Sequence, residues 1–124
     1  MMDAKIDTGT LRAAQRALVV QVGLQLASCC AHAAGLVCLL SGLGSERLLA
    51  APPPARAVIW VWLVAGLVWT ALNARGLWLR RHWARRSTLA YWATPLAWCC
   101  CIPVPVWSIA TLTRPAMRHL FDER

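Results

Sequence analysis

Two neighbouring cysteines and a histidine occur in one apolar stretch near the start of the chain: Cys29, Cys30 and His32. Thiolate and imidazole groups favour soft and borderline metal ions, so these three residues are the candidate ligands for a transported metal ion. The zinc spacings C-x-x-C and H-x-x-x-H are absent, and we predict no resident cofactor. The alternative interpretation is that each free cysteine serves as a small apolar residue, as do the cysteines at 99–101.

The run Leu26-Ala27-Ser28-Cys29-Cys30 resembles the paired-cysteine first helix of small bacterial mercuric ion transport proteins. The resemblance covers only this part of the chain. It implies a short three-span membrane protein that carries a soft metal ion. Proteins of that family also have a second cysteine pair on the cytoplasmic side, and residues 75–87 of this chain contain no cysteine.

Polar residues recur within the apolar stretches at helical spacing. In the first stretch they are separated by four, three and four residues, which places them on one helical face. The polar face expected inside the membrane comprises Gln21, Gln25, Ser28, His32, Thr70, Asn73, Thr94 and Ser108. Such a face either lines a pathway, with His32 as a proton-sensitive group, or bonds helices together. The apolar stretches contain no Asp or Glu, which favours bonding between helices.

The elements that must position these residues are three apolar blocks, at about 17–43, 58–79 and 89–112. Each block has the roughly 20 residues that a membrane-spanning helix needs. The chain is 59% hydrophobic and 15% charged, against about 45–50% and about 25% in soluble domains. We therefore predict an all-α integral membrane bundle of three transmembrane helices. It forms one domain, 1–124, and Pro103 and Pro105 kink its third helix.

Charge predicts the orientation of the bundle. The segment between the second and third blocks, with its basic loop at 80–88, carries the expected cytoplasmic anchor, namely Arg75, Arg80, Arg81, Arg85 and Arg86. The segment between the first two blocks carries only Arg47 and Arg56. The positive-inside rule then places the N-terminus in the cytoplasm and the polar tail, 113–124, outside. If the proline-broken third block is re-entrant, the tail also lies inside. A bacterial inner membrane suits this composition.

Residues 26–29 also read as a lipoprotein cleavage box, with Cys29 as the lipidated residue. The sequence stays apolar to Leu43, whereas a lipoprotein usually continues with a polar linker. We therefore expect an uncleaved first span.

Three functions remain open at this stage. The first is a non-enzymatic accessory or assembly component that associates through its helices, with a protein partner or with itself, because eight tryptophans and small residues provide contact surfaces. The second is a small metal-ion or solute transporter that uses the intramembrane Cys and His residues. The third is an immunity protein against a pore-forming toxin. We expect no enzyme, because paired carboxylates and a phosphate-binding loop are absent from the sequence. We expect no nucleic-acid binding, because the arginines flank the apolar blocks.

Overall fold

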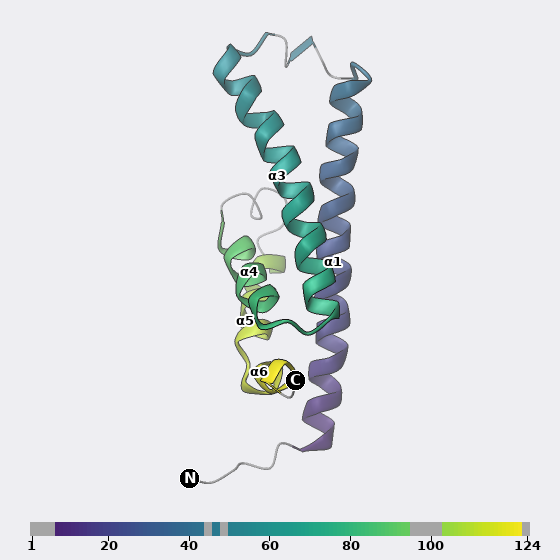
Figure 1. Cartoon of the computed structure of the whole chain (residues 1–124), viewed down its shortest axis with the longest axis vertical. Helices are drawn as coiled ribbons and strands as arrows, with labels where there is room; N and C mark the ends of the chain where they lie inside the picture. Colours follow the sequence, from purple (N-terminus) through teal and green to yellow (C-terminus); the bar gives the residue numbers. More distant parts are fainter. Residues whose placement is uncertain (1–6, 44–45, 48–49, 95–102, 123–124) are drawn as a thin grey trace.

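The computed structural model describes residues 7–43, 46–47, 50–94 and 103–122. Over these residues the secondary structure is helical and contains no strand, which confirms the all-α prediction. The main helices are α1 (Thr8–Leu40), α3 (Pro53–Trp78), α4 (His82–Ala93), α5 (Pro103–Thr113) and α6 (Pro115–Asp122). The two long helices run antiparallel, and the three short helices gather beside one half of this pair (Figure 1).

The helices α1 and α3 are long and apolar enough to cross a membrane. They have 33 and 26 residues, or about 50 and 39 Å at 1.5 Å per residue, against about 30 Å of hydrocarbon. Only 17% and 28% of their most apolar windows are buried. Val19, Val37 and Val61 are each more than 60% exposed. A core helix of a water-soluble domain would instead cover such residues.

The third apolar block does not form one continuous helix over the residues that the structure describes. It is split between α4, which ends at Ala93, and α5, which begins at Pro103. Thr94 has extended angles, φ −78° and ψ 146°, as expected directly before a proline, since Pro95 disfavours the helical conformation there. Pro103 and Pro105 fall in the first turn of α5, where a missing N–H costs no helical hydrogen bond. With 12 and 11 residues, these helices reach only about 18 Å.

The predicted basic loop is also largely helical, because α4 begins at His82. The preceding turn is tight. Arg80 has a φ of 51°, its N–H donates to the Leu77 carbonyl at 3.0 Å, and the Arg81 N–H donates to the Gly76 carbonyl at 2.8 Å. This is the Schellman arrangement that closes a helix, with arginine at the left-handed position that usually holds glycine.

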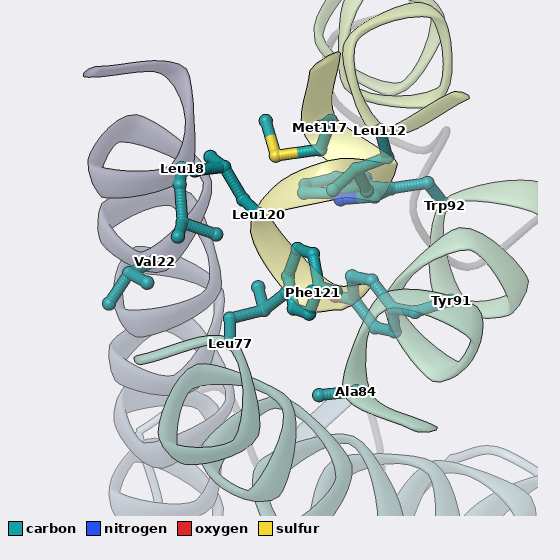
Figure 2. Close-up of a cluster of buried hydrophobic side chains, with 10 residues drawn as sticks. All are labelled: Leu18, Val22, Leu77, Ala84, Tyr91, Trp92, Leu112, Met117, Leu120 and Phe121. Atoms are coloured by element: carbon teal, nitrogen blue, oxygen red, sulfur yellow. The ribbon is translucent and has the colours of Figure 1, made fainter. Parts of the chain in front are cut away.

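The tail, predicted as a polar segment, forms α6 and contributes to the core. Met117, Leu120 and Phe121 are at most 2% exposed, and their spacing places them on one helical face. They close a cluster that draws on all five helices and also contains Leu18, Val22, Leu77, Ala84, Tyr91, Trp92 and Leu112 (Figure 2). Charged residues alternate with this apolar face in the sequence, so composition alone indicates a polar tail.

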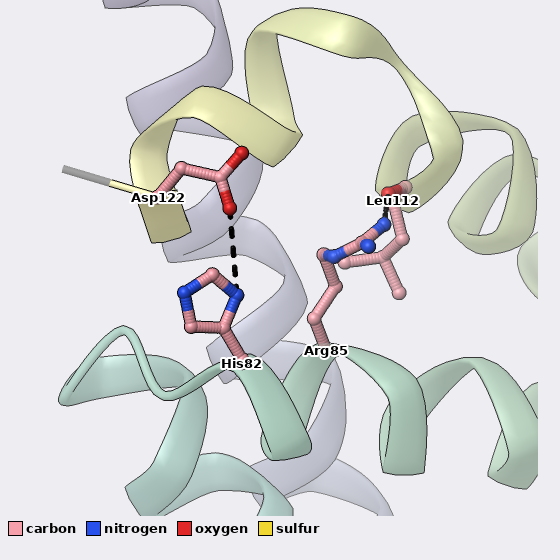
Figure 3. Close-up of polar contacts among 4 residues, drawn as sticks. All are labelled: His82, Arg85, Leu112 and Asp122. Carbon is pink, nitrogen blue, oxygen red and sulfur yellow. Dashed lines mark hydrogen bonds and ion pairs between the residues drawn. The ribbon is translucent and has the colours of Figure 1, made fainter. Parts of the chain in front are cut away.

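One end of the bundle is strongly basic. It is formed by the start of α1, the α3–α4 turn and α6 (Figure 1). We call it the basic end; its arginines are Arg12, Arg16, Arg75, Arg80, Arg81, Arg85, Arg86, Arg114 and Arg118. Two contacts fix the short helices here. The Arg85 Nη1 donates to the Leu112 carbonyl at 3.1 Å, and His82 lies 3.5 Å from Asp122 (Figure 3).

Candidate functional site: a polar layer inside the bundle

The two long helices approach closely because glycines lie at their crossing. A Cβ atom on Gly66 would collide with the His32 imidazole, and one on Gly35 would come within 2.9 Å of Leu63. About one turn before His32 on α1, the Cys29 thiol lies 3.9 Å from the Leu67 carbonyl oxygen. These three contacts set the antiparallel register of α1 on α3.

The same register places Gln25 level with Asn73. It continues one further turn, so that Gln21 lies level with the last turn of α3. All three side chains are 0% exposed. Two of the longest polar side chains in the bundle thus point from α1 into the interface that Asn73 enters from α3.

The short helices bring two hydroxyl groups to the same depth. On α4, Thr88 lies between Ala84 and Tyr91. Ala84 packs against Gly76 of α3, and the ring centroid of Tyr91 lies 5.6 Å from that of Trp69. Because Asn73 lies between Trp69 and Gly76 on α3, Thr88 lies level with Asn73. On α5, Leu112 accepts the hydrogen bond from Arg85 of α4. Ser108 lies one turn before Leu112, and Thr88 lies one turn after Arg85, so the two hydroxyl groups lie at a similar depth.

We call Gln21, Gln25, Asn73, Thr88 and Ser108 the polar layer. Each of them is 0% exposed, and their side-chain N and O atoms have no hydrogen-bond partner. Together they supply three amides and two hydroxyls, hence both donors and acceptors. The layer contains no charged group, and apolar residues of the cluster around Phe121, such as Val22, Leu77 and Tyr91, adjoin it along the helices.

His32 lies on the side of the layer away from the basic end, where its ring packs against Gly66. We call this contact the glycine notch. Its Nδ1 lies 2.7 Å from the Ser28 carbonyl, so Nδ1 carries the hydrogen and donates it. The Trp62 ring meets the imidazole edge-on at 5.7 Å. His32 is 8% exposed. Its Nε2 atom faces the backbone of Gly66.

The structure separates the remaining predicted polar residues from the layer. Thr70 is buried, but its hydroxyl donates to the Gly66 carbonyl of its own helix at 2.7 Å. Ser28 is half-buried, and its main-chain carbonyl accepts the hydrogen bond from His32. Thr94 caps the end of α4, where its hydroxyl donates to the Tyr91 carbonyl at 2.6 Å.

The candidate metal ligands do not converge. Cys29 is half-buried, Cys30 is exposed and His32 is turned into the glycine notch. Among the residues that the structure describes, three His, Cys, Asp or Glu side chains do not come together anywhere as a metal site. The cysteine triplet at 99–101 lies outside the described residues.

The predicted basic anchor lies at the basic end. Arg75, Arg81 and Arg86 are exposed, and Arg80 and Arg85 are half-buried. Partial burial, followed by the positive charge of Arg118, lowers the pKa of Arg85 from its ordinary value.

Thr88 is the member of the layer that sequence reasoning missed. Its burial could have been predicted from helical spacing, because the buried face of α4 consists of Ala84, Thr88, Tyr91 and Trp92. The assignment of 80–88 to a loop concealed that helical periodicity.

Comparison of this chain with protein-family models, with curated proteins and with solved structures finds no match. The polar layer and the basic end are therefore the features from which function is inferred.

Proposed function

We propose that the chain is an integral membrane protein with two spans, α1 and α3, and a re-entrant hairpin formed by α4 and α5. Two observations support this. The apolar residues on the outer faces of the two long helices are exposed, and the two short helices are each too short to cross. The hairpin returns α6 to the end where α1 begins.

This arrangement also improves the charge balance. With a third span, the arginines of the tail would lie opposite those of the α3–α4 turn. With a hairpin, nine arginines gather at one end, and the described part of the opposite end holds Arg47 and Arg56. The positive-inside rule then places the basic end, and both ends of the described chain, in the cytoplasm.

Within this framework we propose that the polar layer binds a small, neutral, hydrogen-bonding solute and serves its passage. The observation that carries this proposal is the set of five fully buried polar side chains, from four helices, that lack partners. A buried polar group left unpaired costs about 1–3 kcal/mol. A solute with both donors and acceptors, such as a small amide, would satisfy several of these groups at once.

The chemistry of the layer indicates neutral solutes in preference to ions. An ion in this position would need opposite charges or many aligned dipoles to offset its desolvation. The layer offers only neutral amides and hydroxyls. The four helices that form it, α1, α3, α4 and α5, contain no Asp or Glu.

Passage can be tested with the purified chain in proteoliposomes, with urea and acetamide as probes and stopped-flow light scattering as the readout. We expect both solutes to enter faster than into empty liposomes, and N73L to abolish the difference. The matched control, T113V, changes an exposed threonine at the end of α5 and should leave entry unchanged. Entry equal to that of empty liposomes, or unaffected by N73L, would refute the proposal.

A second function, helix association, is favoured by the outer face of α3. There Trp60, Val61, Val64, Ala65 and Val68 line an open groove of about 500 Å³ that is almost entirely apolar. We propose this face as the contact for a protein partner or a second copy. Crosslinking of a single cysteine at Val64 tests self-association, with the same change at Val37 on α1 as the control.

A further inference from the structure

A second groove lies at the basic end, between the start of α1 and the end of α3. It encloses about 410 Å³ and is lined by Gln15, Leu18, Val19, Val22, Trp78 and Arg80. Its two halves differ in chemistry. Leu18, Val19 and Val22 form an apolar wall along α1, whereas Gln15 and Arg80 provide polar groups toward the basic end. A ligand that fits both halves must be amphipathic.

The position of the groove matches the boundary between hydrocarbon and headgroups. Trp78, at the end of α3, is 69% exposed, and tryptophan favours that boundary. Val19 and Val22 lie in the first turns of the apolar part of α1, and Gln15 lies just before it. The groove therefore extends from headgroup depth to about two turns into the hydrocarbon.

The charge around the groove selects the headgroup. Arg80 lines the groove, and Arg12 lies one turn before Gln15 on the same face of α1. Arg16 and Arg81 lie beside them and are exposed. The acidic residue of α6, Asp122, contacts His82. Arg80 lies in a closed turn, and this turn brings its side chain to the groove.

We infer that this groove binds an anionic phospholipid. The phosphate would lie between Arg80 and Arg12, and an acyl chain would cover Val19 and Val22. Arginine suits this role because its guanidinium can donate two hydrogen bonds to one phosphate group, and basic pockets between spans on the cytoplasmic side are typical sites for anionic lipids. A free phosphate ion would leave the apolar wall uncovered, which favours a lipid.

This inference rests on the proposed membrane placement but not on solute passage. It can be tested by native mass spectrometry of the purified full chain, released from mixed micelles that contain equal amounts of phosphatidylglycerol and phosphatidylcholine. We expect one phosphatidylglycerol to be retained in preference. R80Q should weaken that preference about fivefold, as expected for one cation near the headgroups. V19W should block the groove and remove retention.

Two controls keep the test specific. R47Q removes an arginine at the opposite end and should change nothing, and circular dichroism should show the same helix content for every variant. Equal retention of the two lipids, or unchanged retention in both R80Q and V19W, overturns the inference. Inorganic phosphate that displaces the lipid completely would also overturn it, because the ion alone would then satisfy the site. Failure of solute entry in proteoliposomes would leave these outcomes unaffected.

Discussion

The guanidinium of Arg85 donates a hydrogen bond of 3.1 Å to the main-chain carbonyl of Leu112 (Figure 3). The donor lies in the first turns of α4 and the acceptor in the last turn of α5, so the contact holds the start of α4 beside the end of α5. This contact supports the proposed hairpin of α4 and α5.

Replacing Arg85 by methionine should lower the free energy of unfolding by about 1 kcal/mol, because the Leu112 carbonyl loses its donor. The apolar part of the side chain is kept. The neighbouring Arg86 is exposed, and R86M should change stability by less than about 0.5 kcal/mol. Unfolding in mixed micelles with increasing SDS, followed by circular dichroism, measures both. Equal effects of the two variants would contradict a specific role of the bond.

The topology predicts which positions a membrane-impermeant thiol reagent reaches in intact cells. In a cysteine-free background, single cysteines at Thr8 and His119 should be protected, and a cysteine at Ser41, just after α1, should be labelled. All three positions are exposed in the structure, so the membrane alone should decide the result. Labelling at His119 would contradict the proposed hairpin and favour three full spans.

The glycine notch predicts opposite effects for two Gly→Ala changes. In G66A the new methyl group would collide with the His32 ring, which should cost about 1–3 kcal/mol of stability. In G23A no atom lies within 4 Å of the new methyl group, so the higher helix propensity of alanine should stabilise the protein by up to about 1 kcal/mol. The same micelle titration applies. A neutral G66A would show that the helices do not cross as described.

The burial of α6 predicts that the tail is structural. Phe121 is 0% exposed in the cluster shared by all the helices, and F121A should destabilise the protein by about 3–5 kcal/mol through lost contacts and a cavity. H119A alters an exposed residue two positions away and serves as the control. Protease resistance of α6 in micelles provides a second readout. A tail that is cleaved as readily in the wild type as in F121A would argue against packing.

The left-handed turn predicts a gain in stability. R80G should stabilise the protein by about 1 kcal/mol, since glycine adopts this conformation without the Cβ clash that arginine incurs. Arg81 has an extended backbone, with φ −80°, so R81G should instead be neutral or destabilising. The difference between the unfolding midpoints of these two variants is the measurement. A loss of stability in R80G would mean that contacts of the Arg80 side chain outweigh its backbone strain.

Much of the interior could be predicted from spacing alone. The intervals between Gln21, Gln25 and His32 indicate a helical face, and each of these residues is buried. Asn73 and Ser108 are also buried. Period and polarity suffice here because a polar side chain on a long apolar helix has only the bundle interior to enter.

The path of the third block could not be read from hydropathy. An apolar stretch of sufficient length predicts a span, but length does not say whether the chain turns back. Pro95, Pro103 and Pro105 are compatible with a kinked span and with a re-entrant segment, and the sequence alone does not choose between them. The contacts that favour the proposed hairpin are tertiary: Arg85 bonds to Leu112, and the apolar face of α6 joins the cluster around Phe121.

The placement of the short helices also gives the described part of the molecule an uneven profile. The helices α4, α5 and α6 lie beside the half that ends at the basic end, whereas α1 and α3 are the helices, among the main ones described, that continue into the other half (Figure 1). In a bilayer such a wedge would occupy more area in one leaflet than in the other. Lipids packed around it would then tilt toward the narrow half, so the protein would be accommodated with least strain where the membrane already curves in that sense.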